Sequence, residues 1–279
     1  MFHLEKMEVD DFLFAVQLAN TMNWNMTPVD FEFMTKLEPD GCFVLFHDQE
    51  RAGIATSISF GKAGWFGNLV VKKEFRREGA GNLLTRHAIG CLKNKGVETI
   101  GLYAYPHLVN FYERLGFESD IDFAVVTGKA TVSPIKDRLK EATNLEVPEI
   151  IDFDRQCFGA NRQKLLEAIL LESGNLCFIS TENSKITGYV AAKVHGKTAE
   201  VGPLICHANH EETAVLLLDT VLSRLNGVEV FMYIPKKEAE LLNMLTKVGF
   251  KEDFCVVRMF LGSPVAKNCI CTAESLERG

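Results

Sequence analysis

The sequence predicts an α/β protein made of two copies of one domain, each a mixed, mainly antiparallel twisted sheet flanked by helices. Helix-spaced and strand-like apolar segments alternate along the 279 residues, which indicates a mixed fold. The repeat rests on two segments: VNFYERLGFESD at 109–120 matches LNMLTKVGFKED at 242–253, sharing Asn, Gly, Phe and Asp at a constant offset of 133 residues. A chain of this length can bury two ordinary cores.

The first part of the chain predicts two helices followed by three strands. Residues 10–20 and 27–37 carry apolar side chains at helical spacing, and the second segment begins with Thr27 as an N-cap and Pro28 at the first helical position. Residues 41–71 then form three apolar runs separated by the polar or glycine-bearing turns HDQER and GKAG. These runs predict an antiparallel meander.

The next segment predicts a strand–loop–helix–strand unit. Apolar residues mark one face of a helix from Leu83 to near Gly96, and VETIGLYAY at 97–105 returns as a strand. A short helix within 107–117 and a strand at 121–128 complete the first copy.

The repeat sets the expected domain boundaries. Carried upstream without a gap, the offset places leucines of one helix on leucines of another: Leu83, Leu84 and Leu92 fall on Leu216, Leu217 and Leu225. We therefore expect domains at 1–128 and 129–279, joined around TVSPIKDRLKE, where Ser133 and Pro134 interrupt the pattern.

The charge and hydropathy patterns limit the classes of partner that the chain is expected to bind. The net charge is −7, and basic residues form only short pairs such as Lys72–Lys73. Because nucleic-acid binding requires a positive stripe, no nucleic-acid partner is expected. The opening MFHLEKMEVDD lacks an apolar signal core and no run reaches transmembrane length, so we expect no membrane association and a cytoplasmic location.

The eight cysteines are interpreted as reduced thiols. Six lie inside apolar, element-like segments and are expected to pack as small core residues: Cys42, Cys91, Cys157, Cys177, Cys206 and Cys255. Cys269 and Cys271 in NCICT could bind a metal or form a bridge, but no second C-x-x-C or His pair supports this. The favoured interpretation is a tail of little consequence, and no metal is predicted.

The stretch FRREGAGNL at 75–83 is the candidate anion-binding loop. Glycines before a helix leave backbone N–H groups open at its N-terminus, which favours an anion, and Arg76 and Arg77 add donors for phosphate oxygens. The alternative is a glycine turn that needs positive φ. The spacing R-x-x-G-x-G matches neither a Walker loop nor a dinucleotide fingerprint.

The second copy argues for a ligand. The offset places Asn209, Glu212 and Ala214 opposite Arg76, Gly79 and Gly81, and Glu211 adds a second negative charge. Since the helix persists without the glycines and the arginine, these residues are better explained by an anion than by the turn.

The combination of LVVKKEFRREGAG with VNFYERLGF resembles the GNAT N-acetyltransferase superfamily over residues 1 to about 128. NWNMTPVDFEFMTKLEPDGCFV and FDRQCFGANRQKLLEAI resemble a two-domain, tandem GNAT subgroup, in which an intact N-terminal domain precedes a degenerate one. The resemblance implies the α+β GNAT fold in both domains.

The resemblance also implies that acetyl-CoA is the co-substrate. Its pantetheine arm would pair with a strand and its pyrophosphate would bind the amides of 77–82, giving the expected cofactor residues Leu69, Val70, Val71, Arg76, Arg77, Glu78, Gly79, Ala80, Gly81, Asn82 and Asn110. Tyr105 occupies the place where family members often carry an asparagine.

By its position in the motif, Tyr112 matches the family's tyrosine acid, which the resemblance implies as the proton donor. A phenol is protonated at neutral pH and can donate to the departing thiolate; the alternative is a tyrosine that packs the helix against the sheet. Val71 is the expected oxyanion donor. AGWFGNLVV contains no carboxylate to act as the base, which leaves His107 as a candidate or as a surface histidine. Asp40 and Trp24 could shape the acceptor pocket, or serve as a turn residue and a core residue.

The expected activity is N-acetyltransferase: transfer of an acetyl group to a primary amine of a small molecule or protein, with the second domain at the acceptor site or at an interface. Three alternatives stay open. The chain could be an acetyl-CoA-binding regulator without transfer activity, a scaffold, or a tandem enzyme whose two domains form one cleft. A monomer or homodimer is expected.

Overall fold

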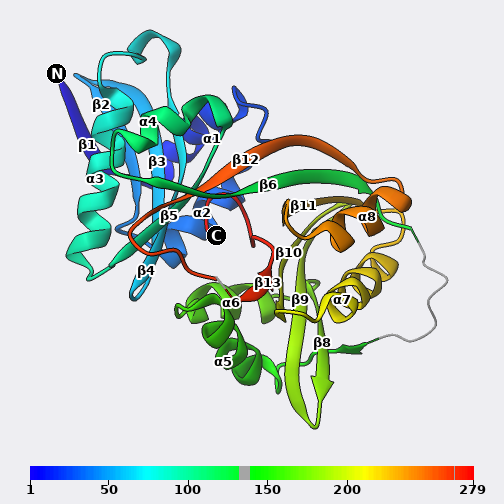
Figure 1. Cartoon of the computed structure of the whole chain (residues 1–279). Coiled ribbons are helices and arrows are strands. Elements are labelled where there is room, and N and C mark those ends of the chain that lie inside the picture. Colours follow the sequence, from blue (N-terminus) through cyan, green and yellow to red (C-terminus); the bar gives the residue numbers. More distant parts are fainter. Residues whose placement is uncertain (132–138, 267) are drawn as a thin grey trace. The chain divides into compact units, whose positions relative to one another are not determined.

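The computed structural model describes residues 1–131, 139–266 and 268–279. Ser133 and Pro134 of the predicted linker lie outside the described residues. The chain forms two compact units, Met1–Leu102 with Arg278, and Tyr103–Glu277 with Gly279. Each unit combines a sheet with helices, which confirms the predicted α/β class (Figure 1).

The sheet of the first unit has the strand order β1-β2-β3-β4-β5. Its neighbours are antiparallel except for the parallel pair β4 and β5. This confirms the predicted meander and adds β1, which was not predicted. The strands are β1 Phe2–Lys6, β2 Cys42–His47, β3 Glu50–Phe60, β4 Ala63–Val71 and β5 Thr99–Ala104, and the helices are α1 Phe12–Asn20, α2 Pro28–Leu37 and α3 Ala80–Asn94.

Helix α2 begins where the sequence predicts. Thr27 is the N-cap and Pro28 is the first helical residue. The backbone N–H of Thr27 donates to the Asp30 carboxylate at 2.7 Å, and the Thr27 hydroxyl donates to the same oxygen at 2.8 Å. This capping box satisfies donors that a helix start otherwise leaves unpaired.

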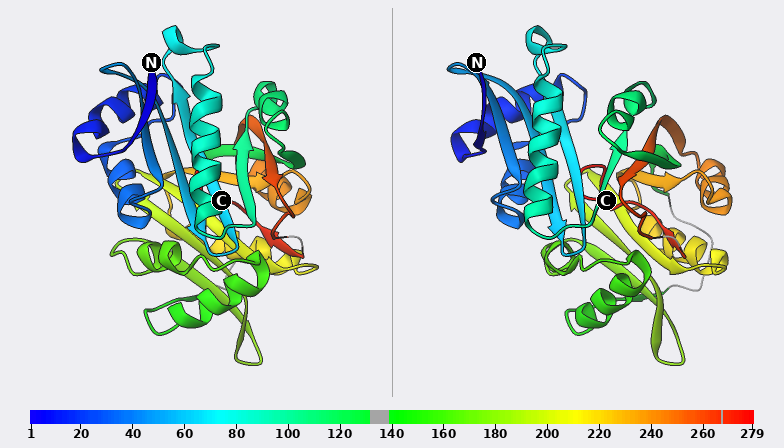
Figure 2. Two further views of the ribbon diagram at one scale, coloured as in Figure 1. Left: turned by 90° about the vertical axis from the view of Figure 1, so that its left-hand side faces the viewer. Right: turned by 60° about the vertical axis from the view of Figure 1, so that its left-hand side comes forward.

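Helix α3 covers one face of the first sheet (Figure 2). Its apolar stripe, Leu84, Ala88 and Leu92, is buried as the helical spacing predicts. On β3, Gly53 allows this close packing, because a Cβ at that position would lie 3.2 Å from Leu84 and 2.9 Å from the Val70 carbonyl oxygen. The packing fixes the start of α3 relative to the end of β4.

The second unit contains the strand order β12-β6-β11-β10-β9-β8-β7, with β13 paired to β10. Its strands are β6 Glu118–Lys129, β7 Lys140–Glu141, β8 Leu176–Glu182, β9 Lys185–His195, β10 Thr198–His207, β11 Glu229–Pro235, β12 Lys251–Leu261 and β13 Cys269–Cys271. Its helices are α4 Val109–Glu113, α5 Val147–Phe158, α6 Gln163–Leu170, α7 Glu211–Arg224 and α8 Ala239–Lys247.

The division into compact units differs from the repeat-based boundary at residue 128. Strand β6 closes the first sequence copy, yet it lies between β11 and β12 and pairs antiparallel with both. These ladders place β6 and the preceding α4 in the second unit, so the division falls between Leu102 and Tyr103. The sequence repeat and the spatial unit therefore end at different residues.

Among the described residues, none of the helices has the length and apolar character needed to cross a bilayer.

Candidate active site

The predicted anion-binding loop joins β4 to α3. A single 3-10 turn, Lys73–Phe75, follows the strand, and Gly79 is the N-cap of α3. Gly79 has φ 87° and ψ −3°, a left-handed conformation that costs glycine little, and Arg77 also has a positive φ of 67°. Consecutive N–H groups in such a turn point outward and form an anion-binding nest.

Six consecutive backbone N–H groups are open at this loop. Within the described parts of the chain, no acceptor is found for the N–H groups of residues 77–82. The last three belong to the first turn of α3, where helix geometry provides no partner and the macrodipole is positive. The first turn of α3 contains no acidic residue. The loop therefore offers the donors and the field that a phosphate group requires.

The side chains of the loop have different roles. Arg76 donates from Nε to the Val71 carbonyl oxygen at 2.8 Å, so one edge of its guanidinium closes the loop onto β4. Arg77 and Glu78 are exposed. Asn82 accepts from Arg86 Nε at 2.6 Å and is thereby paired along the helix. Binding of a phosphate by these side chains stays a prediction.

Strand β4 has a free edge beside this loop. Its pairing with β5 covers only Ala63–Trp65 against Thr99–Gly101. From residue 66 to residue 71, β4 is bonded to β3 alone, and no described strand pairs with its other edge. The predicted pantetheine residues, Leu69 to Val71, lie on this unpaired stretch, which can accept an extended, amide-bearing ligand as an added strand.

Two buried polar atoms, one on β3 and one on β4, were not predicted. A bulge in β4 sets Asn68 at φ 49°, and Asn68 Nδ2 is buried without a hydrogen-bond partner among the described residues. The same holds for Thr56 Oγ1 on β3, whose residue pairs with Gly67. Buried polar groups rarely go unpaired without a functional reason. A lone Asn within an apolar strand was the available sequence signal.

The corresponding loop of the second copy differs. Strand β10 runs on to His207 and α7 begins at Glu211, so three residues replace the eight between β4 and α3. Glu211 and Glu212 lie in the first turn of α7, as the sequence predicts, and their charges oppose an anion there. The N-caps Gly79 and His210 are structural counterparts, and only Gly79 is itself left-handed, whereas in the shorter loop the left-handed residue is Asn209, with φ 64°. The backbone conformation of Gly79 therefore accounts for part of the need for glycine there.

The predicted acid, Tyr112, belongs to the second unit and is buried there, 6% exposed. Its ring packs edge-on against Phe111 and Phe117, with centroid distances of 4.9 and 5.9 Å. Burial raises the pKa of the Tyr112 hydroxyl above its ordinary value. Leu245 fills the matching position in α8 and is also buried, so the packing alone does not require the hydroxyl.

His107 and Asn110 are exposed near the start of α4. His107 stacks on Tyr105 with a centroid distance of 5.7 Å and an interplanar angle of 20°. The Phe254 ring of β12 also packs on Tyr105, with a centroid distance of 5.6 Å and an interplanar angle of 37°. Tyr105, which replaces the family's asparagine, is thus part of an aromatic cluster.

The two residues considered for the acceptor pocket both lie in the first unit. Asp40 is an exposed turn residue whose carboxylate pairs with Lys6, and the Lys6 hydrogen bond lowers the pKa of Asp40. This agrees with the turn interpretation. Trp24 is half-buried, which agrees neither with a fully buried core residue nor specifically with a residue of the acceptor pocket.

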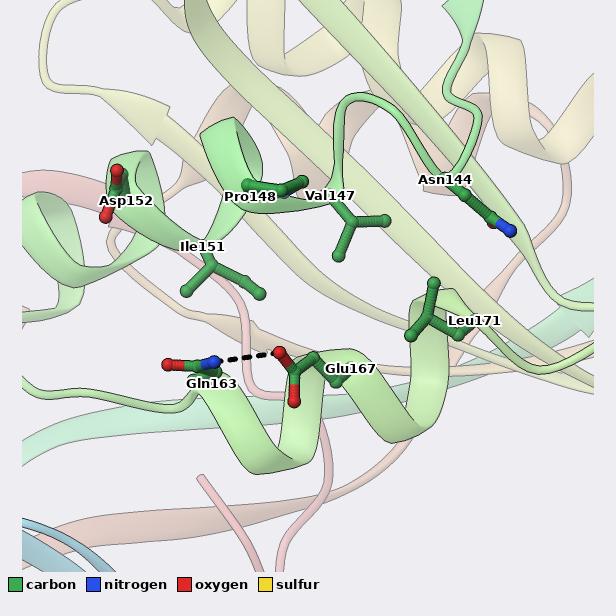
Figure 3. A pocket seen from close by; sticks show the side chains of 8 residues that line it. All are labelled: Asn144, Val147, Pro148, Ile151, Asp152, Gln163, Glu167 and Leu171. Atoms are coloured by element: carbon green, nitrogen blue, oxygen red, sulfur yellow. Dashed lines mark hydrogen bonds between the residues drawn. The ribbon is translucent and has the colours of Figure 1, made fainter.

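A hollow of about 330 Å³ lies at α5 and α6 in the second unit (Figure 3). Apolar Val147, Pro148 and Ile151 face it from α5, and Gln163 and Glu167 of α6 bond to each other at its floor at 2.8 Å. It contains none of the predicted site residues.

The interpretation of Cys269 and Cys271 as part of an inconsequential tail is wrong. They form β13, pair with β10 and are buried, 3% and 5% exposed. The eight cysteines are free thiols. In the parts of the chain that the structure describes, no group of three His, Cys, Asp or Glu side chains is arranged to hold a metal ion.

The mixed sheet, the limited pairing of β4 with β5 and the glycine-bearing loop before α3 agree with the predicted GNAT fold. Residues 38–119 and residues 150–269 each match a family model described as "Acetyltransferase (GNAT) domain". The chain belongs to the GNAT acetyltransferases and carries two such domains in tandem.

Two curated proteins are similar to this chain in sequence. The chain is 30% identical over 116 residues to the "Uncharacterized N-acetyltransferase ycf52" of Gracilaria tenuistipitata var. liui, which covers 38% of this chain and 61% of that protein, less than two thirds of its length. It is 22% identical over 278 residues to the "Holothin acyltransferase" of Pseudoalteromonas sp. (strain SANK 73390), covering 97% and 92% of the two chains.

Two solved structures share the fold. A protein of Pyrococcus horikoshii, provisionally described as an acetyltransferase, matches with a TM-score of 0.83 at 21% identity over 100% of this chain and 96% of that one. A GCN5-related N-acetyltransferase from Sphaerobacter thermophilus matches with a TM-score of 0.66 at 14% identity, covering 95% and 98%. At these identities the likeness concerns the fold.

Proposed function

We propose that the chain is an N-acetyltransferase that moves the acetyl group of acetyl-CoA to a primary amine. The observation that carries the proposal is the continuity of two ligand-binding features in the first unit. The edge of β4 that no described strand pairs, residues 66–71, leads into the loop whose N–H groups at 77–82 have no acceptor among the residues that the structure describes. A pantetheine arm needs an extended strand edge for its amides, and the pyrophosphate at its end needs an anion site directly after that edge.

The chemistry requires three events at the thioester. The neutral amine nitrogen attacks the carbonyl carbon, and the resulting oxyanion is stabilised by an N–H donor, which we assign to Val71. The carbon–sulfur bond then breaks, and the thiolate takes a proton from the acid, which we assign to Tyr112. The phenol is protonated at neutral pH, as its ordinary pKa of about 10 already implies, and burial raises that pKa further. The amine loses its own proton to water or to His107.

Thr56 Oγ1 and Asn68 Nδ2 are buried and have no hydrogen-bond partner in the described part of the chain, which supports a polar ligand next to β4. We assign them to the positioning of the thioester or of the incoming amine. The second domain is proposed to bound the acceptor site or to provide an interface. Since one relative is named an acyltransferase, the length of the acyl chain belongs in the test.

The test measures free CoA release from acetyl-, propionyl- and butyryl-CoA in the presence of a library of primary amines. We expect release that depends on one class of amine and falls strongly in Tyr112→Phe. If acetyl-CoA binds but no amine elicits release, the chain is a cofactor-binding regulator, and transfer is excluded for the amines tried.

Binding is tested separately by titration calorimetry. Gly81→Glu places a carboxylate in the first turn of α3 and should abolish acetyl-CoA binding through repulsion. Gly90→Glu is the matched control, since it adds the same charge to the same helix at a position where a Cβ has no neighbour within 4 Å. Equal affinity in both variants would refute the assignment of the loop.

A further inference from the structure

The second copy repeats the split between two parallel strands. Strand β10 pairs with β11 over Thr198–Glu200 against Glu229–Phe231 only, three pairs, as β4 does with β5. Both β4 and β10 also carry a bulge before their last residues, between 67 and 70 in β4 and between 201 and 204 in β10. The second copy therefore retains the architecture that in the first copy leaves one edge of β4 free.

In the second copy this edge is occupied by the chain itself. Strand β13 pairs antiparallel with β10 at 205–207, and because β9 covers the other edge of β10, β13 lies on the side facing β11 (Figure 1). Thr272 continues the ladder: its N–H donates to the Leu204 carbonyl at 3.0 Å, and its hydroxyl accepts from the Leu204 N–H at 2.8 Å. The Ala273 N–H then donates to the Tyr233 carbonyl of β11 at 3.1 Å, so the segment bridges both strands.

The segment fits closely. Thr272 is 0% exposed and Ala273 is 1% exposed. A Cβ added to Gly202, at the bulge of β10, would lie 2.2 Å from the Ala273 carbonyl oxygen, a distance that real Cβ atoms do not adopt. Ile270 belongs to the core that includes α7, and the Cys269 thiol donates to the Cys157 carbonyl of α5 at 3.3 Å. The segment is thus held by backbone ladders and side chains on both faces.

We infer that the slot between β10 and β11 is a peptide-binding site whose occupant is the segment 269–273 of the same chain. An extended peptide supplies along β10 the amide hydrogen bonds that we propose pantetheine supplies along β4. With its edge bonded and Glu211 and Glu212 at the start of α7, this slot takes no acyl-CoA. One chain then has one acyl-CoA site. The comparison with β4 rests on the proposed function, whereas the docking of 269–273 does not.

Hydrogen–deuterium exchange on the full chain, with and without acetyl-CoA, tests both parts. Without ligand, the amides of Leu204, Thr272 and Ala273 should exchange on the order of a hundredfold more slowly than those of unstructured peptide. Saturating acetyl-CoA should slow exchange in 69–71 and 77–82 and leave these three amides unchanged, with one equivalent bound.

Rapid exchange at Thr272 and Ala273 in the unliganded chain would overturn the docking. Release of these amides by acetyl-CoA, or a second bound equivalent, would overturn the exclusion of the cofactor. If acetyl-CoA alters neither β4 nor β10, the proposed function fails, while slow exchange at 272–273 still establishes the peptide site.

Thr272→Val is the targeted variant, because valine keeps the volume and removes the hydroxyl that accepts from Leu204. We expect exchange at Leu204 and Ala273 to become about tenfold faster, as the loss of one buried hydrogen bond implies. Thr246→Val is the control; its hydroxyl donates to Leu242 on the exposed side of α8. Equal exchange at Leu204 and Ala273 in both variants would contradict a role for this bond in docking.

Discussion

Arg162 and Asp154 form a bidentate ion pair sealed inside the second unit. Arg162 donates from Nε and Nη2 to the two carboxylate oxygens of Asp154 at 3.2 and 2.6 Å, and both side chains are 0% exposed. Tyr189 donates its hydroxyl to the same carboxylate at 2.7 Å, and the Phe158 ring centroid lies 3.9 Å from the guanidinium carbon. Asp154 lies in α5, Arg162 directly precedes α6 and Tyr189 lies in β9, so these bonds connect the three elements.

Removing one partner of this pair should be costly. Asp154→Ala removes the carboxylate partner of the buried Arg162 and leaves the guanidinium its bond to the Gly279 oxygen at 2.9 Å, so we expect a loss of about 3–5 kcal/mol in the free energy of unfolding. Tyr189→Phe removes one hydrogen bond to a charged group and should cost about 1.5–3 kcal/mol. Urea denaturation of each variant and of the unchanged chain measures both losses in the free energy of unfolding. A smaller loss for Asp154→Ala than for Tyr189→Phe would contradict the proposed dominance of the ion pair.

The loop conformation makes a prediction about two glycines, the N-cap of α3 and one inside that helix. Gly79→Ala forces a side chain into a left-handed residue and should destabilise the chain by about 1–2 kcal/mol. Gly90→Ala, inside the helix with open space around it, should stabilise by about 0.5–1 kcal/mol. Thermal denaturation with opposite shifts in Tm checks the pair. If both substitutions stabilise, Gly79 does not have positive φ.

The sequence predicted those elements whose signals are local. The start of α2 at Thr27 and Pro28 follows from capping chemistry, and the buried face of α3 follows from leucine spacing. Strand β1 was missed although Phe2 and Leu4 alternate with polar residues, because five residues give a weak period-2 signal. Strand β13 has three residues, and its position depends on pairing with a segment more than sixty residues away.

The sequence predicted the position of the loop before α3, but not the correspondence of the helix N-caps or the buried polar atoms beside β4. Glycine and arginine spacing predicted a loop that leads into a helix at residues 76–82, and the structure has Gly79 as the left-handed N-cap of α3 there, since a helix start is a local feature. Ligand binding by these residues stays a prediction. The repeat, however, paired Gly79 with Glu212 by sequence, whereas the structure pairs the N-caps Gly79 and His210. Thr56 Oγ1 and Asn68 Nδ2, which have no partner among the described residues, are buried beside a bulge, and neither a bulge nor burial is encoded in a single residue.

The buried thiols should resist chemical modification. Burial raises the pKa values of Cys42, Cys177 and Cys206 to about 12, so at pH 8 roughly one thiol in ten thousand is a thiolate. We expect these three cysteines not to react with an aromatic disulfide reagent in the folded chain, and all eight thiols to react after denaturation. Reaction of all eight at one fast rate without denaturant would contradict this burial.

Tyr112 makes the sharpest kinetic prediction. Because burial raises its pKa, the phenol stays protonated up to at least its ordinary pKa of about 10, so loss of this acid should produce no decline in kcat below that pH. Tyr112→Phe preserves the ring contacts with Phe111 and Phe117, and should lower kcat by about 10²-fold while leaving KM for acetyl-CoA and the Tm unchanged.

The pH profile and the rate together separate an acid from a packing residue. A tyrosine that only packs would give Tyr112→Phe a kcat equal to that of the unchanged chain, as the buried Leu245 of α8 suggests is sterically possible. A decline in kcat near pH 8 that disappears in Tyr112→Phe would mean that the hydroxyl ionises early, against the direction that burial imposes. A reduced kcat in Tyr112→Phe with no decline below pH 10 in the unchanged chain is the result that assigns the proton to this residue.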